Sequence, residues 1–232
     1  GLTSEVFYAD FAPPTPFDGL EGYAERFARR IGKQTATDVP TGWNSWGGGS
    51  RMGGYSSEID ETLSGAADDT TLLLQNEINE VGTLMQQAHA RGLRICFNPA
   101  PMDASVVEYP LETVSTLVLN ETEGAALAGE GSPAQVLEKL ALRLPKAEIV
   151  LTLGEAGVMA CSGGTTHRLP AQKVDVVDTT AAGDTFIGYF LARRLAGDGL
   201  QAALSCAVRA AAICVSREGA RPSIPRADEV GC

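Results

Sequence analysis

Residues 93–97, Leu93-Arg94-Ile95-Cys96-Phe97, form a short apolar run that stops at the breaker Asn98-Pro99-Ala100-Pro101. Strands that are apolar along their whole length are typical of a parallel sheet buried on both faces. Three further runs of this kind occur, at 70–75 (TTLLLQ), 116–119 (TLVL) and 149–153 (IVLTL). The four runs predict the strands of one mainly parallel sheet.

The segments between and after these runs have the spacing of helices. We expect helices at 80–91, 121–128, 133–142, from near 182 past 195, and 200–216, and a hairpin that pairs 158–162 with 166–170. Alternation of strands and helices predicts an α/β fold, a three-layer sandwich with a mainly parallel central sheet. In such sheets ligands bind at the carboxyl ends of the strands, which here carry Glu77, Asn98, Asn120 and Gly154.

Composition excludes several classes of protein. The formal net charge is −11, and without a Lys/Arg cluster we expect no nucleic-acid partner. No apolar run approaches the ~18 residues of a membrane span, so no membrane association is expected. The five cysteines are odd in number and none is in CxxC spacing, so we interpret them as reduced core residues of a cytoplasmic protein. His89 and His167 are isolated and fit solvated surface positions better than metal ligands.

The best candidate for a catalytic site is the stretch 177–186, VDTTAAGDTF. The small residues at 181–183 allow a tight turn into the following helix. The N–H groups of Ala182, Gly183 and Asp184 would then point outward and, with the helix dipole, form an anion hole. Asp184 could take a proton from an attacking hydroxyl group. The alternative for Asp184 is a plain helix N-cap.

Residues 178–184 resemble the second signature of the ribokinase-like sugar kinases. Other motifs of that family are matched in the same order: NPAP at 98–101, NETE at 120–123, TLGEAG at 152–157 and REGARPSIP at 217–225. The resemblance covers about residues 59–230. It implies the ribokinase-like fold and an ATP-dependent phosphoryl transfer to a primary hydroxyl of ribose or a related sugar, with ATP and the small-molecule sugar as partners.

The resemblance also implies roles for single residues. Asp184 matches the catalytic base, and Ala181, Ala182 and Gly183 match the anion hole. Asn120 matches a contact to the nucleotide phosphates and Glu123 a position tied to Mg²⁺ through water. For this pair a helix capping box is an alternative that can hold together with the functional role.

The nucleotide site implied by the resemblance includes a loop, Thr152, Leu153, Gly154, Glu155, Ala156 and Gly157. Val208 falls near the expected adenine position, with a place in the helix core as the alternative, and for Gly157 the alternative is a β-turn glycine. Glu77 matches a contact to the sugar, and its alternative is a helix-start glutamate favoured by the dipole.

A monovalent cation site, usually for K⁺, is implied by the positions of Asp178, Thr180, Cys214, Arg217, Gly219 and Ser223. Backbone oxygens would supply most of the ligands, because a hard cation prefers oxygen. Cys214 would accordingly contribute its carbonyl group and not its thiol.

Residues 1–54 do not match the family, so we divide the chain into an atypical Gly/Pro/aromatic-rich extension (1–54) and the ribokinase-like domain (55–232). The family's early sugar contact, its GGKGAN loop and its lid strands are not recognised, and the glycine-rich segment 47–54 fits a spacer. Without recognisable lid strands, through which relatives pair, a homodimer has no support in the sequence.

The sequence leaves two other functions open. One is a nucleotide-binding remnant of a sugar kinase with little or no sugar turnover. The other is a fragment of a glycoside hydrolase, since 41–46 (TGWNSW) resembles the GWNSW segment of α-galactosidase-like enzymes. The barrel of those enzymes needs about 250 residues, which 54 residues cannot supply.

Overall fold

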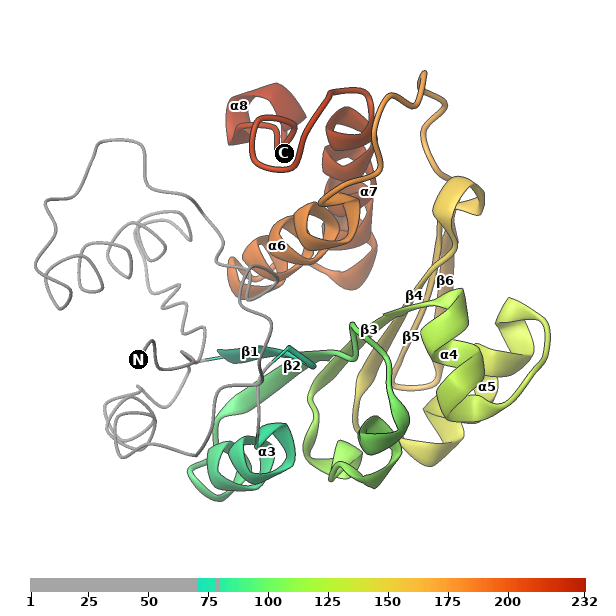
Figure 1. Ribbon diagram of the computed structural model, residues 1–232, viewed down its shortest axis with the longest axis vertical. Coiled ribbons are helices and arrows are strands. Elements are labelled where there is room, and N and C mark those ends of the chain that lie inside the picture. Colours follow the sequence, from blue (N-terminus) through green and yellow to red (C-terminus); the bar gives the residue numbers. More distant parts are fainter. Residues whose placement is uncertain (1–70, 78–79) are drawn as a thin grey trace, which may run out of the picture.

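The computed structural model describes residues 71–77 and 80–232 (Figure 1). The expectations for 1–54, including the GWNSW-like segment and the glycine-rich spacer, lie outside the described residues. The same is true of the boundary expected near residue 55. The structure therefore tests the predicted α/β domain from its first strand onward.

The strands of the described part form one sheet. β1 (Thr71–Gln75), β2 (Arg94–Asn98), β3 (Thr116–Asn120) and β4 (Glu148–Thr152) are parallel neighbours in chain order. β5 (Val158–Ser162) and β6 (Thr165–Leu169) add an antiparallel hairpin at the β4 edge. The predicted mainly parallel sheet and the predicted hairpin are confirmed.

Helices cover both faces of this sheet (Figure 1). α3 (Val81–Ala90), α4 (Glu121–Ala128) and α5 (Pro133–Arg143) pack on one face, and α6 (Ala182–Leu195), α7 (Leu200–Val215) and the short α8 (Ala227–Val230) pack on the other. Side chains of a strand alternate between the two cores: Ile95 and Phe97 join the first, and Cys96 joins the second. The three layers predicted from the sequence are present.

Three 3-10 turns complete the described chain: η2 (Ala104–Glu108), η3 (Leu111–Thr113) and η4 (Gly154–Ala156). No helix in the described ranges combines the length and apolar character that crossing a bilayer requires.

The starts of α4 and α5 are capped by side chains, whereas the start of α6 is not. Asn120 with Glu123, and Ser132 with Gln135, each form a reciprocal capping box. α6 begins at Ala181, a left-handed residue with φ 61° and no side-chain hydrogen bond to the helix. A helix start without a side-chain cap keeps N–H groups for another acceptor.

At the other end of the sheet an ion pair ties α6 to β4. Glu148, buried at the beginning of β4, accepts from Nε and Nη2 of Arg194 at 3.1 and 3.0 Å. A bidentate pair of this kind fixes the relative orientation of the two side chains as well as the distance between them. It sets the end of α6 against the sheet and so orients the whole helix.

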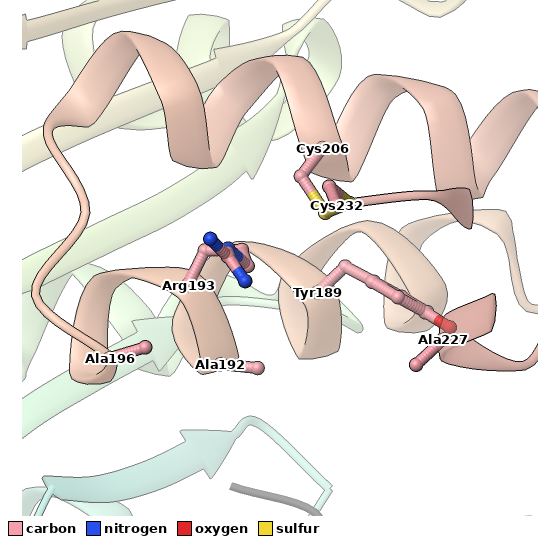
Figure 2. A pocket seen from close by; sticks show the side chains of 7 residues that line it. All are labelled: Tyr189, Ala192, Arg193, Ala196, Cys206, Ala227 and Cys232. Carbon is pink, nitrogen blue, oxygen red and sulfur yellow. A yellow bond between two sulfur atoms is a disulfide. The ribbon is translucent and has the colours of Figure 1, made fainter. Parts of the chain in front are cut away.

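The interpretation of all five cysteines as reduced is wrong for two of them. Cys206 of α7 and Cys232 form a disulfide with their Cα atoms 6.0 Å apart (Figure 2). The chain after α8 turns back along α7, where Nη1 of Arg209 donates to the carbonyls of Val230 and Gly231 at 2.9 and 3.1 Å. Sequence spacing does not reveal this return of the C-terminal segment.

The other cysteines fit the prediction of buried thiols: Cys96, Cys161 and Cys214 are free and buried. Burial, with Glu148 nearby, raises the pKa of the Cys96 thiol well above its usual range. That thiol therefore stays protonated and acts as an apolar group. His89 is exposed, as predicted, and His167 is half-exposed on β6.

We predict that Cys232→Ser lowers the melting temperature of the oxidised protein by about 5–10 °C. The disulfide closes a loop with a sequence separation of 26 residues, which corresponds to about 3 kcal/mol of unfolding free energy. Thermal melts with and without dithiothreitol measure the effect. Reductant should lower the melting temperature of the wild type to that of the variant and leave the variant unchanged. A count of five free thiols in the denatured, unreduced wild type would contradict the disulfide.

Candidate active site

The polar ends of the parallel strands gather at one edge of the sheet. Gln75 of β1 is in register with Asn98 of β2, and Asn120 of β3 is in register with Thr152 of β4. Parallel strands that end together bring their last side chains to the same edge. Of the strand-end positions expected from the sequence, Asn98 and Asn120 end β2 and β3, whereas Glu77 and Gly154 lie two residues beyond the ends of β1 and β4.

Asp184 lies against the β1 end of this edge. Nε2 of Gln75 donates to Oδ1 of Asp184 at 3.2 Å and to Oδ1 of Asn98 at 3.0 Å. The Asp184 side chain is exposed and belongs to the first turn of α6. The N-cap residue is Ala181, so the alternative of Asp184 as a plain N-cap is wrong. The carboxylate is held at the strand ends, where a ligand can reach it.

The turn into α6 differs in one detail from the predicted anion hole. The N–H of Ala182 does not point outward, because it donates to the carbonyl of Thr179 at 3.2 Å. The first bond of the helix follows, from the N–H of Thr185 to the carbonyl of Ala181 at 2.9 Å. The N–H groups of Gly183 and Asp184 belong to the first turn, where a helix offers no internal acceptor. They are the candidate donors to an anion.

The loop before α6 is fastened by Asp178. Its Oδ1 accepts from the N–H and hydroxyl of Thr180 at 2.9 and 2.6 Å, and its Oδ2 accepts from the N–H of Gly219 at 3.0 Å. These hydrogen bonds, above all that of the Thr180 hydroxyl, lower the pKa of Asp178. Because the pKa is lowered, these hydrogen bonds stabilise the fold at pH values above the ordinary aspartate pKa. This stabilisation is lost as the pH falls through the lowered pKa.

A second set of contacts joins the same loop to the buried end of α7. The thiol of Cys214 lies 3.6 Å from the carbonyl oxygen of Thr180 and 3.2 Å from the hydroxyl of Ser223, which donates to the carbonyl of Ala220. Both Cys214 and Ser223 are fully buried. Five of the six predicted cation-site positions are thus in one contact network: Asp178, Thr180, Cys214, Gly219 and Ser223.

The side chain of the sixth position, Arg217, points elsewhere. Its guanidinium pairs with Glu229 of α8, and this hydrogen bond raises the pKa of Arg217 and lowers the pKa of Glu229. The N–H of Arg217 donates to the carbonyl of Cys214 at 3.1 Å. Within the described part of the chain, His, Cys, Asp and Glu side chains form no cluster that could hold a metal ion. A cation in this loop would therefore depend mainly on backbone oxygens.

Asn120 and Glu123 form the capping box that the sequence offered as an alternative. Oε2 and Oε1 of Glu123 accept from the backbone N–H and Nδ2 of Asn120, both at 2.9 Å. Burial raises the pKa of Glu123, and the two hydrogen bonds from Asn120 oppose that rise. The box fixes the carboxamide of Asn120 at the carboxyl end of β3.

The glycine loop after β4 contains two glycines with different surroundings. Gly157 has φ 97°, and a Cβ there would lie 2.1 Å from the carbonyl oxygen of Leu169. Gly154 has φ 52°, and a Cβ there would meet nothing within 4 Å. Gly157 is therefore required by the backbone of the hairpin, whereas Gly154 faces open space beside Glu155 and Ala156, which are exposed.

The remaining predicted positions differ in their burial and in their contacts. Thr152 donates from its hydroxyl to the carbonyl of Leu119 at 3.3 Å, and Leu153 is buried in the core. Val208 is partly buried against the α6–α7 core, which is the alternative that the sequence left open. Glu77 follows β1 and is half-buried.

Sequence reasoning missed Gln75. It is the polar last residue of the apolar run 70–75, and that position was a usable signal. It also missed the bond from the hydroxyl of Tyr109 to Oδ1 of Asn76, at 2.7 Å, which fixes the chain just before Glu77. A small pocket beside the disulfide contains none of the predicted site residues (Figure 2).

Comparison with known proteins agrees with this architecture. The model of the pfkB family carbohydrate kinases matches residues 66–227. The chain belongs to the pfkB family of carbohydrate kinases. Ribokinase of Staphylococcus aureus is 33% identical over 169 residues, 71% of this chain and 55% of the relative. Ribokinase of Schizosaccharomyces pombe is 36% identical over 170 residues, 68% of this chain and 53% of the relative.

Solved structures of ribokinases share the fold. Ribokinase of Thermotoga maritima has a TM-score of 0.64 and 35% identity, with 73% of this chain and 57% of that one covered. Ribokinase of Arabidopsis thaliana, solved with ribose and ATP, has a TM-score of 0.66 and 26% identity, with 76% and 58% covered. The chain spans about half the length of the curated relatives it matches.

We predict that Gly157→Ala destabilises the domain far more than Gly154→Ala does. The first adds a clash with the carbonyl of Leu169 to a strained backbone and should cost at least ~3 kcal/mol. The second adds only the left-handed strain, about 1 kcal/mol. Urea unfolding measures both, with Gly164→Ala in the hairpin turn (φ 78°, open space) as the matched control. Equal losses for Gly157→Ala and Gly164→Ala would contradict the close approach.

Proposed function

We propose that this chain carries out ATP-dependent phosphoryl transfer to a primary hydroxyl of ribose or a closely related sugar. The observation that carries the proposal is the position of Asp184. Its exposed carboxylate belongs to the first turn of a helix without a side-chain cap and accepts a hydrogen bond from Gln75 at the end of β1. A base beside free helix N–H groups is the arrangement that phosphoryl transfer to a hydroxyl requires.

In the proposed reaction Asp184 accepts the proton of the sugar hydroxyl. The hydroxyl oxygen bonds to the γ-phosphorus of ATP as the bond to the β–γ bridging oxygen breaks, which leaves ADP and the sugar phosphate. The N–H groups of Gly183 and Asp184 would donate to the oxygens of the transferring phosphoryl group. Charge builds up on these oxygens, so donors fixed before the reaction stabilise the transition state.

The nucleotide would extend along the other strand ends. Asn120 would contact the phosphates, and the open face of the loop at Gly154 would contact the rest of the nucleotide. The Arabidopsis ribokinase was solved with ribose and ATP, and this relative supports the choice of both ligands. Glu77, half-buried at the end of β1, would accept hydrogen bonds from the hydroxyls of the sugar.

Mg²⁺, the usual companion of ATP, would neutralise phosphate charge when bound. Glu123 fits only an indirect role, because both of its carboxylate oxygens already accept from Asn120. A water molecule on a remaining lone pair would connect it to the ion. The side chain orients Asn120 whether or not the ion is present.

K⁺ would fit the loop that Asp178 fastens. The contact network includes the backbone oxygens of Thr180 and Ala220, a kind of ligand that suits a hard monovalent cation. When bound, the ion would stiffen the turn that precedes Ala181. The sequence alternative of a hydrolase fragment gains no support, since the GWNSW-like segment lies outside the family match.

We predict that Asp184→Asn lowers ribose-dependent ADP release by ~10²–10⁴-fold, because the variant loses the base. The change is isosteric, so the affinity for ADP should stay within about threefold. A coupled assay with and without saturating ribose measures turnover, and calorimetry measures ADP binding. Glu138→Gln, on the exposed face of α5, is the matched control.

Retention of more than about a tenth of wild-type turnover by Asp184→Asn would overturn its role as base. If the wild type binds ADP but ribose and related sugars do not stimulate ADP release, the chain is a nucleotide-binding remnant. If it does not bind ADP at all, the proposed function is wrong.

We also predict that potassium raises the affinity for ATP. A cation bound between Asp178 and the 217–223 segment would hold the first turn of α6 in shape for the phosphates. Calorimetric titrations in potassium chloride and in choline chloride, at equal ionic strength, should differ by about tenfold or more. Ser223→Ala, which alters the buried network, should weaken the potassium effect. Equal affinities in the two salts would exclude an operating cation site.

A further inference from the structure

We infer that Gln75 is a positioning residue, which aims the Asp184 carboxylate at the substrate hydroxyl; the inference rests on the proposed function. Gln75 comes from β1, and Asp184 follows it by 109 positions, at the start of α6. The hydrogen bond between them is a direct link from the sheet to the proposed base. None of the family motifs at 98–101, 120–123, 152–157, 178–184 and 217–225 contains Gln75.

A series of hydrogen bonds through the neighbouring strands holds the side chain of Gln75 in place. Nδ2 of the buried Asn98 donates to the carbonyl of Val118 at 3.0 Å. Oδ1 of Asn98 accepts from Nε2 of Gln75 at 3.0 Å, and the same Nε2 donates to Oδ1 of Asp184 at 3.2 Å. These hydrogen bonds connect β3, β2 and β1 to α6, so three of the four parallel strands support the carboxylate.

The direction of donation in this series of hydrogen bonds is also fixed. The carbonyl of Val118 can only accept, so the Asn98 carboxamide must turn its nitrogen to β3 and its oxygen to Gln75. Gln75 in turn meets two oxygens and must offer both N–H groups of its amide. A flipped Gln75 amide would place its own oxygen against Asp184 and Asn98. Each amide orientation is therefore determined by its neighbours, and the last member presents a donor to Asp184.

The result is a carboxylate with one oxygen engaged and one available. Oδ1 of Asp184 accepts from Gln75, and Oδ2 has no hydrogen-bond partner among the described residues. A base acts only when its free lone pair faces the proton, and a misplacement of 1 Å can cost about 10²-fold in rate. Gln75 orients the Asp184 carboxylate in this way without contacting the reacting atoms.

The test compares Gln75→Met and Gln75→Glu with the wild type. Methionine keeps the length and loses the donors, and glutamate sets a second acceptor against Asp184. We expect kcat for ribose-dependent ADP release to fall by about 10- to 100-fold in Gln75→Met, and at least as far in Gln75→Glu. The KM for ATP should stay close to that of the wild type, and the melting temperature should fall by a few degrees, because both variants leave Oδ1 of the buried Asn98 without its donor. Gln86→Met, on the exposed face of α3, is the control for the substitution itself.

A double-mutant cycle with Asp184→Asn separates positioning from a general structural effect. If Gln75 acts through Asp184, Gln75→Met removes little further activity once Asp184 is asparagine. Independent, additive losses, or a kcat of Gln75→Met within twofold of the wild type, would overturn the inference while the proposed function stands. A wild type without sugar-stimulated ADP release would overturn the proposed function and the inference with it.

Discussion

Burial of the parallel sheet on both faces is the constraint on which the rest of the structure depends. β1 to β4 carry apolar side chains toward two cores, so each face needs its own helical layer. α3 to α5 come from the connections between strands, but the second layer must return from the end of the chain. That return places the first turn of α6 at the strand ends, and the ion pair of Arg194 with Glu148 fixes the helix at its other end.

The start of α6 is stabilised from outside the helix. A left-handed alanine at position 181 costs on the order of 1 kcal/mol, and no side chain caps the first turn. The three hydrogen bonds to Asp178 hold the preceding loop against Gly219. The helix start can thus keep N–H groups for a ligand, where a capping side chain would have used them.

The sequence was sufficient for the layers, the strands and two of the four expected strand-end positions, because apolar runs and helical spacing depend on local pattern. It was insufficient where the deciding contact is long-range. The pairing of Cys206 with Cys232 depends on how the C-terminal segment folds back along α7. The bond of Gln75 to Asp184 joins residues 109 positions apart, and the turn of the Ala182 N–H to Thr179 depends on backbone angles that composition does not encode.

A side-chain amide whose orientation is fixed by hydrogen bonds occurs at two strand ends. The Asn120 carboxamide accepts from the N–H of Glu123 through Oδ1 and donates to Oε1 of Glu123 through Nδ2, so its orientation is fixed. One N–H of Nδ2 is left over, which suits an anionic phosphate. At β1 the Gln75 amide is oriented by Asn98 and offers its second N–H to Asp184. In both places a neutral amide of determined polarity presents a donor at the edge of the sheet. In the proposed reaction, an acidic protein would in this way direct hydrogen-bond donors toward the phosphate and the base without adding a positive charge.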